Sequence, residues 1–89
     1  MVKLEVFSGE PPCPGCVAII GLAQRIAARY PDELELTVLK GAEAMPKFEE
    51  YRLFCVPAAV VNGSIRIEGM CPSETTLNNA LREGGLCLR

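Results

Sequence analysis

The motif Cys13-Pro14-Gly15-Cys16 constrains this chain more than any other stretch, because it lies between a strand-like run and a helix-like run. The run before it ends at Phe7, and the run after it begins at Val17. A proline suits the first position of a helix, since it needs no backbone donor there and its φ is already near the helical value. We therefore expect Cys13 at the N-cap of a helix, with Cys16 one turn later and facing it.

A cysteine at a helix N-cap has a distinct chemistry. The unsatisfied N–H groups and the positive end of the helix dipole stabilise its thiolate, which is the nucleophilic form. A disulfide between Cys13 and Cys16 would close a very small loop and restrict little chain entropy, which suits a bond that is made and broken. The motif therefore predicts a redox-active dithiol in which Cys13 is the more exposed and more readily ionised thiol. The alternatives are a chance pair or half of a zinc knuckle, although the chain has no second CxxC at ordinary spacing.

The composition excludes several function classes. The chain has 89 residues, of which 49% are hydrophobic and 22% charged, as expected for one small globular domain spanning residues 1–89. Its net charge is -2 and its basic residues are dispersed, so we expect no nucleic-acid partner. Histidine is absent, which excludes Cys-His pairs, Ser-His-Asp triads and His-ligated zinc.

The apolar runs are too short to span a membrane, so we expect no membrane partner. Residues 1–7 alternate between apolar and charged side chains, which is typical of a strand and not of a signal peptide. We therefore expect a cytoplasmic protein, and a monomer.

Hydrophobic periodicity predicts the element order β-α-β-α-β-β-α. The expected elements are a strand at 2–7, a helix at Pro14–Tyr30, an edge strand at Leu34–Val38, a short helix within Gly41–Phe54, strands at Ala58–Val61 and Ser64–Glu68, and a helix after the Ser73 cap through Arg82. Asn62-Gly63 suits a type I′ hairpin turn, and Gly84 is expected to take the left-handed conformation after the last helix. Parallel pairing of the first two strands would complete a βαβ unit.

With this order, the sequence resembles the thioredoxin and glutaredoxin superfamily over nearly its whole length, and most closely its small glutaredoxin-like members. Three sites carry the resemblance: the Cys13-Pro14-Gly15-Cys16 motif, Val56-Pro57 before the third strand, and Glu68-Gly69-Met70-Cys71 before the last helix. The resemblance implies an α/β, thioredoxin-like fold, a four-stranded mixed sheet flanked by three helices. The first and last helices would cover one face and the second helix the other.

The same resemblance implies a thiol-disulfide oxidoreductase. Cys13 would be the attacking thiol, Cys16 the resolving thiol, and Pro57 a cis residue opposite them. The substrate-binding residues that it implies are Pro14, Gly15, Val56, Pro57, Gly69 and Met70. The implied partners are protein disulfide substrates and a dithiol reductase, with no cofactor and no metal.

The chain also departs from both subfamilies. Glu10 stands where glutaredoxins commonly have a basic residue that helps hold a glutathione carboxylate, and Met70 stands where their glycine turn has a second glycine. Thioredoxins usually carry a tryptophan just before the motif and a buried aspartate in the strand below it, where this chain has Pro12 and Phe7. We therefore expect protein substrates and poor use of glutathione. Glu10 is either a solvated loop carboxylate or a charge that tunes the site.

Three cysteines lie outside the motif. Cys55 and Cys71 are either small buried apolar residues or auxiliary thiols, because the family's cis-proline loop and glycine turn lie close to the CxxC helix. As auxiliary thiols they would bind a soft metal or an iron-sulfur cluster together with Cys13 and Cys16, or act as a relay that passes the disulfide onward. A metal or cluster carrier is therefore the alternative function. Cys87 is expected to be a surface thiol that does not bridge to Cys71.

Overall fold

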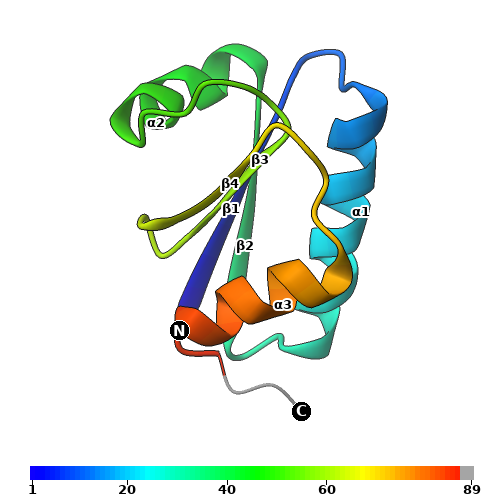
Figure 1. Cartoon of the computed structure of the whole chain (residues 1–89), viewed down its shortest axis with the longest axis vertical. Helices are drawn as coiled ribbons and strands as arrows, with labels where there is room; N and C mark the ends of the chain where they lie inside the picture. The colour runs from blue at the N-terminus through cyan, green and yellow to red at the C-terminus, as the bar shows by residue number, and fades with distance from the viewer. Residues whose placement is uncertain (87–89) are drawn as a thin grey trace.

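The computed structural model, which describes residues 1–86, contains a four-stranded sheet with helices on both faces (Figure 1). Its elements are β1 (Val2–Ser8), α1 (Pro14–Arg29), β2 (Leu34–Lys40), the 3-10 helix η1 (Gly41–Ala44), α2 (Met45–Glu50), β3 (Ala58–Val61), β4 (Ile65–Glu68) and α3 (Glu74–Glu83). The strand order is β2-β1-β3-β4, with β1 and β2 parallel and the other pairs antiparallel. This arrangement confirms the predicted thioredoxin-like fold. No helix in the described part of the chain is long and apolar enough to cross a membrane.

The sheet separates two apolar clusters, as the alternation of β1 predicts. Val2, Leu4 and Val6 belong to the larger cluster, which α1 and α3 cover. Phe7 belongs to the smaller cluster, to which α2 contributes Phe48. Figure 1 shows α2 on the opposite side of the sheet from α1 and α3, the arrangement that the sequence led us to expect. Because both faces of β1 are covered, this central strand holds the loop that follows it in a defined place.

The end of α3 corrects one prediction. Gly84 has a φ of -76°, and Gly85 instead takes the positive φ of 106°. The reason is that the helix continues one residue further than predicted, to Glu83, which moves the left-handed position along by one. The N–H of Leu86 donates to the carbonyl of Leu81 at 2.9 Å, the long hydrogen bond of a Schellman motif.

The predicted hairpin turn is present, and it also holds the end of α3. Asn62 and Gly63 have φ values of 52° and 74°. The side chain of Asn62 accepts a hydrogen bond from the N–H of Lys3 at 2.8 Å and donates one to the carbonyl of Gly84 at 2.7 Å. A Cβ on Gly84 would lie 2.6 Å from Cγ1 of Val61, so Gly84 is required for close packing and not for its φ.

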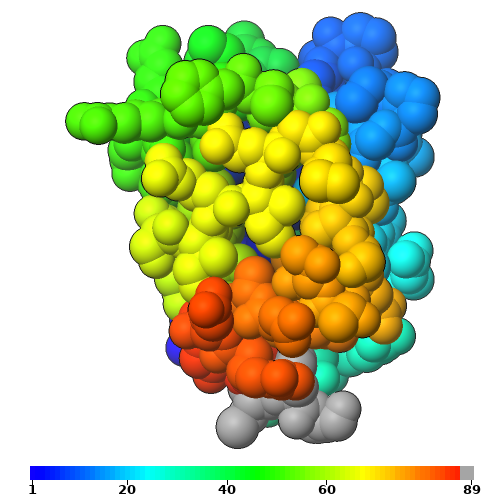
Figure 2. Space-filling view, viewed as in Figure 1, coloured from blue at the N-terminus to red at the C-terminus, as the bar shows by residue number. Residues whose placement is uncertain are grey.

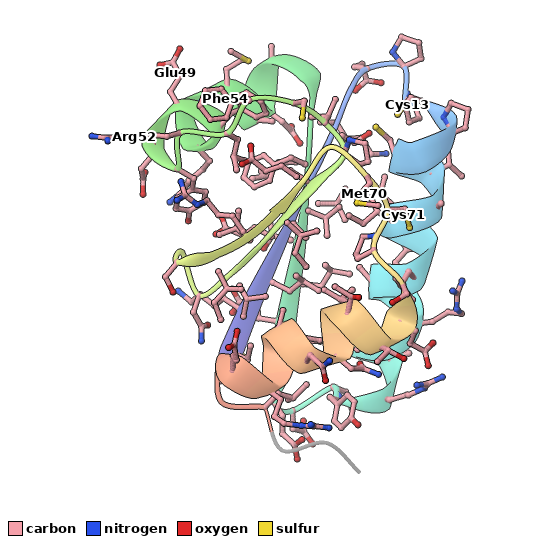
Figure 3. All side chains as sticks on the ribbon, in the orientation of Figure 1. Cys13, Glu49, Arg52, Phe54, Met70 and Cys71 are labelled. Atoms are coloured by element: carbon pink, nitrogen blue, oxygen red, sulfur yellow. The ribbon has the colours of Figure 1, made fainter. Side chains whose placement is uncertain are left out.

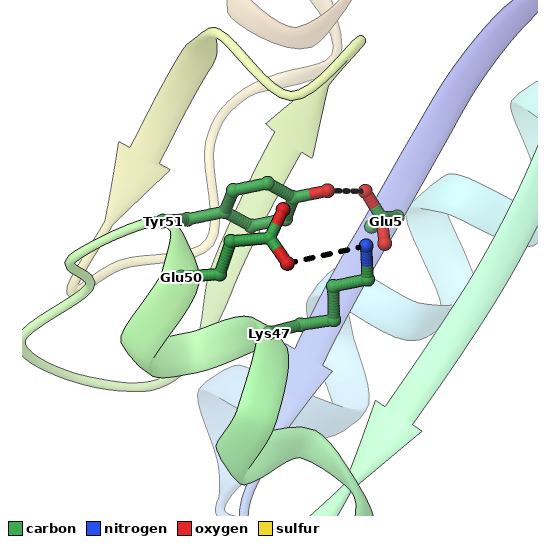
Figure 4. A network of polar contacts seen from close by, with 4 residues as sticks. All are labelled: Glu5, Lys47, Glu50 and Tyr51. Atoms are coloured by element: carbon green, nitrogen blue, oxygen red, sulfur yellow. Dashed lines mark hydrogen bonds and ion pairs between the residues drawn. The ribbon is translucent and has the colours of Figure 1, made fainter.

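The segment after α2 is attached to the sheet through Tyr51. Its hydroxyl donates a 2.6 Å hydrogen bond to Oε1 of Glu5 on β1 (Figure 4). Its ring packs edge-on against Phe7, with 6.1 Å between the ring centroids. Lys47 lies over the same ring, 5.5 Å from its centroid, and pairs with Glu50 at 3.6 Å. These contacts place the residues that follow Tyr51, which lead into β3 and the candidate site.

Candidate active site

The dithiol lies at the start of α1, beyond the end of β1 (Figure 3). Cys13 is the helix N-cap, with φ -76° and ψ 169°, and its sulfur accepts a hydrogen bond from the N–H of Cys16 at 3.2 Å. Pro14 begins the helix, as its fixed φ predicts. Cys13 is exposed and Cys16 is fully buried. The two sulfurs therefore have the order of exposure that an attacking thiol and a resolving thiol require.

The two sulfurs lie 2.8 Å apart, with the Cys13 thiol donating to Cys16. Burial raises the pKa of the Cys16 thiol. Hydrogen bonds from the Cys13 thiol, from the backbone of Gly9 and Cys13 and from the Ser8 hydroxyl outweigh it, so this pKa lies below its ordinary value. These contacts therefore stabilise the thiolate of Cys16. The expectation that Cys13 ionises first stays a prediction.

Pro57 faces the dithiol from the start of β3. The Val56–Pro57 peptide bond is cis, as the family resemblance implies. A Cβ on Gly15 would lie 3.3 Å from Cγ of Pro57 and 3.9 Å from the Cys13 sulfur, so the missing side chain lets Pro57 approach the motif. The carbonyl of Pro57 accepts a 2.9 Å hydrogen bond from the N–H of Gly69, which has a φ of 82°. The fold thus brings together the three sites that carry the resemblance.

Glu10 lies beside the site but is directed at another segment. Its side chain covers Gly41, where an added Cβ would lie 2.8 Å from the Cβ of Glu10. Gly41 has a φ of 56° and begins η1, so the carboxylate stands between the dithiol loop and the end of β2. Its charge is not among the causes that act on the Cys16 thiol. The sequence did not predict that the Glu10–Pro11 bond is also cis. Tuning of the dithiol by Glu10 stays a prediction.

Within the described residues, Cys55 and Cys71 do not assemble with the dithiol into a ligand set. Cys55 is exposed, so its interpretation as a small buried residue is wrong, because the loop before Pro57 turns its side chain to the surface next to Gly69. Cys71 is half-buried against the larger cluster. Figure 3 shows it beside a part of α1 that lies further from the start of the helix than Cys13 does. Within residues 1–86, no group of three or more Cys, Asp or Glu side chains is placed to hold a metal ion. The metal or cluster carrier therefore has no site in this part of the chain. Cys87 lies outside the described residues.

A groove of about 390 Å³ adjoins the dithiol loop, and sequence reasoning missed it. It is lined by Ser8, Gly9, Gly41, Ala42, Ala44, Met45, Phe48, Phe54, Cys55 and Val56. One signal in the sequence pointed to it. Leu53 and Phe54 are adjacent large apolar residues just before the third strand, and in an extended segment such neighbours point to opposite sides. Leu53 is 6% exposed and Phe54 is 88% exposed.

The fold and the site define a class of protein, in which an N-cap dithiol faces a cis-proline on a thioredoxin-like sheet. A family model for the thioredoxin domain matches residues 2–82. The chain therefore belongs to the thioredoxin family, and it is a thiol-disulfide oxidoreductase.

The matches to related proteins cover nearly the whole chain. A thioredoxin of Methanocaldococcus jannaschii is 32% identical over 82 residues, which cover 92% of this chain and 94% of the relative. A probable thioredoxin of Methanothermobacter thermautotrophicus is 30% identical over 83 residues, covering 93% and 95%. The crystal structure of oxidised mitochondrial thioredoxin 3 from Saccharomyces cerevisiae covers 92% of this chain and 77% of its own, with a TM-score of 0.72 and 17% identity. That likeness confirms the fold.

Proposed function

We propose that this protein exchanges disulfides with protein substrates through Cys13 and Cys16, with Cys13 attacking and Cys16 resolving. The observation that carries the proposal is the exposed Cys13 sulfur, held at a helix N-cap 2.8 Å from the buried Cys16 sulfur. An accessible sulfur meets the partner first, and a buried sulfur in contact with it can act only afterwards and only on Cys13.

The reaction balances without a cofactor. The Cys13 thiolate attacks one sulfur of the partner disulfide, forming a mixed disulfide, and the partner's other sulfur leaves as a thiolate that takes up a proton. The Cys16 thiolate then attacks the Cys13 sulfur, and the partner's second sulfur leaves in the same way. Two electrons pass to the partner and the Cys13–Cys16 disulfide remains. An external dithiol reductase must return it to the reduced state.

The substrate-binding assignment concerns the residues around the dithiol. Val56 precedes the buried Pro57 and is exposed, as is Met70, and the N–H of Gly69 donates a hydrogen bond to the carbonyl of Pro57. An extended peptide can pair with backbone groups beside a strand entrance such as this one. Pro14 and Gly15 would border the same peptide, because Gly15 lies against Pro57. We propose that an extended polypeptide binds to this surface. We also propose that the protein acts in the cytoplasm, a reducing compartment in which thiols persist.

We also propose that glutathione binds poorly to this surface. The ligand carries two carboxylates, and its recognition uses cationic side chains or backbone donors. Glu10 instead places a carboxylate next to the dithiol loop, and it is exposed there. The expected substrates are therefore proteins.

The experiment is to trap the mixed disulfide. A Cys16→Ser variant cannot resolve it, so incubation with an oxidised protein such as insulin should yield a covalent adduct that mass spectrometry places on Cys13. Cys13→Ser is the matched control and should form no such adduct. An adduct on Cys55 in the Cys16→Ser protein, or exchange that persists in Cys13→Ser, would overturn the assignment.

A further inference from the structure

We propose that the hydroxyl of Ser8 donates a hydrogen bond to the Cys16 thiolate in the resolving step, when Cys13 is held in the mixed disulfide and has no hydrogen left to donate. Ser8 is then a further catalytic residue, because its hydroxyl contacts a reacting atom. The inference rests on the proposed function, since it assumes that Cys13 attacks first and Cys16 second. It deepens that function by naming a group that keeps the second sulfur ionised.

Ser8 is a buried polar residue at the end of β1. Only 2% of its area is exposed, and among residues 1–86 no other serine, threonine, asparagine, glutamine or charged residue is buried. A buried hydroxyl is unfavourable unless it finds acceptors inside the protein. The loop after β1 and the start of α1 form the blue surface at the upper end of the molecule in Figure 2, where a partner can reach them. Ser8 acts on the protein's own groups instead.

The Ser8 hydroxyl has two acceptors within reach. It donates a 2.9 Å hydrogen bond to the carbonyl of Gly9, and it is also one of the groups that hydrogen-bond the Cys16 thiol. A hydroxyl carries one hydrogen, which rotates to suit its surroundings. Because hydrogen bonds to ionised acceptors are the stronger ones, this hydrogen turns from the Gly9 carbonyl to the Cys16 sulfur when that sulfur is a thiolate.

The Cys13 thiol assists Cys16 only while both thiols are reduced. Burial raises the pKa of Cys16, and hydrogen bonds more than offset this effect, the Cys13 thiol contributing most and the Ser8 hydroxyl least. In the mixed disulfide the Cys13 sulfur is bonded to the partner and carries no hydrogen, so the 2.8 Å contact between the two sulfurs loses its donor. Ser8 is the other side chain that bonds the Cys16 thiol, and it keeps its hydrogen throughout the reaction.

No charged side chain acts on Cys16 within the part of the chain that the structure describes. The groups that act on its thiol are hydrogen-bond donors at the end of β1, in the loop after it and at the start of α1. Lys40, which pairs with Ser8 across β1 and β2, is exposed and is not among them, and neither is Glu10. The pH dependence of the resolving step therefore follows the ionisation of Cys16.

The hydroxyl takes part without being consumed. The Cys16 thiolate attacks the Cys13 sulfur, the disulfide between them forms, and the partner's sulfur leaves with the electron pair of the broken bond. The negative charge moves from Cys16 to the leaving sulfur, so the hydrogen of Ser8 returns to the Gly9 carbonyl. A donor of this kind raises the share of Cys16 that is ionised, but it also makes each thiolate less nucleophilic.

The test follows both steps by stopped flow, with the reduced protein in excess over dithiobis(nitrobenzoate). Attack by Cys13 releases one nitrothiobenzoate, and attack by Cys16 on the resulting mixed disulfide releases the second. We expect Ser8→Ala to leave the first rate within about twofold and to slow the second roughly threefold near pH 7, because fewer Cys16 thiols are ionised. Near pH 10 the second rate should equal or exceed that of the wild type, because both proteins are then ionised and the thiolate of the variant is the more nucleophilic.

Two further variants separate the hydroxyl from packing. Ser8→Thr and Ser8→Val have side chains of nearly the same shape, but only threonine keeps a donor, so the threonine variant should resolve faster near pH 7. Ser73→Ala is the matched control. It removes a serine hydroxyl that donates a 2.9 Å bond to Thr76, beside Glu74, which pairs with Arg29 in the last turn of α1. Both steps should keep their wild-type rates in this control.

The outcomes distinguish the inference from the proposed function. A second step in Ser8→Ala that equals the wild type near pH 7, or that is slowed by the same factor at every pH, would overturn the inference and leave the proposed function standing. Equal rates for the threonine and valine variants would do the same. Release of a second nitrothiobenzoate that persists in Cys16→Ser would overturn the proposed function and the inference together.

Discussion

The hydroxyl of Tyr51 and the carboxylate of Glu5 form a 2.6 Å hydrogen bond that ties the end of α2 to the central strand (Figure 4). This bond, followed by burial and by the charges of Glu5 and Glu50, raises the pKa of Tyr51 to about 12. The tyrosine lies three residues before Phe54, so the same contact that fixes α2 also positions one wall of the groove.

Tyr51→Phe removes this hydrogen bond and leaves the carboxylate without that donor. We expect the free energy of unfolding to fall by about 1 to 2 kcal/mol, measured by urea denaturation. The contribution is fully present below pH 10, the ordinary pKa of the side chain, and is lost as pH rises through the folded value of about 12. The difference between wild type and Tyr51→Phe should therefore shrink across that interval. A Glu5→Gln variant tests the pairing, and additive losses in the double variant would contradict it.

Gly15→Ala would place a methyl group 3.3 Å from Pro57, in the space between the motif and the cis-proline. We expect disulfide exchange to slow by roughly threefold to tenfold, because one of the two must shift by a few tenths of an ångström and a small misplacement of reacting groups is costly. Gly21→Ala is the matched control within the same helix, since a Cβ there would meet only the flexible Arg25 side chain at 3.6 Å. It should leave exchange unchanged and stabilise α1 by about 0.5 to 1 kcal/mol. An equal loss of exchange in both variants would point to a general effect on the helix.

The different exposure of the two thiols predicts which of them is alkylated first. In the wild type, the hydrogen bond between the two sulfurs stabilises the thiolate of Cys16, whose pKa lies below its ordinary value. Iodoacetamide should modify Cys13 before Cys16, because Cys13 is exposed and Cys16 is not. Mass spectrometry identifies the modified residue, and earlier modification of Cys16 would reverse the roles.

The same lowered pKa has a consequence for stability. A thiol whose pKa is depressed in the folded state contributes stability above its unfolded pKa, and this contribution is lost as pH falls through the folded value. The reduced protein should therefore gain free energy of unfolding, relative to Cys16→Ser, as pH rises toward the ordinary thiol pKa. A flat difference between the two proteins over that range would contradict a stabilised thiolate.

Glu10→Lys tests why glutathione should be a poor substrate. Replacing the repulsive carboxylate with a cation should raise deglutathionylation of a mixed disulfide by about fivefold at low salt, which corresponds to ~1 kcal/mol. Reduction of insulin should change much less, because that partner binds over a larger surface. Efficient glutathione turnover by the wild type, unchanged in Glu10→Lys, would show that Glu10 excludes nothing.

Short stretches of the sequence were sufficient to predict the element order and the start of the dithiol helix. Pro14 favours a helical first residue, and Cys13 before it becomes the N-cap, because the determining contacts lie within four residues of each other. The Asn62-Gly63 turn was predictable for the same reason, since both residues accept a positive φ. The alternation of side chains along β1 predicts which residues share a face of the strand. The central position of β1 became clear only from the sheet order and from the apolar clusters on both of its faces.

Contacts between distant segments decided the rest. Pro57 meets Gly15 across more than forty positions of the chain, and Gly84 packs closely against Val61, more than twenty positions before it. Periodicity does not state which of two adjacent apolar residues, Leu53 and Phe54, faces water. That choice follows from the hydrogen bond between Phe54 and Glu68 and from the packing of Leu53 in the smaller cluster. Local preferences depend on a few neighbouring atoms, whereas exposure depends on which remote surfaces meet, so the dithiol was predictable and the groove beside it was not.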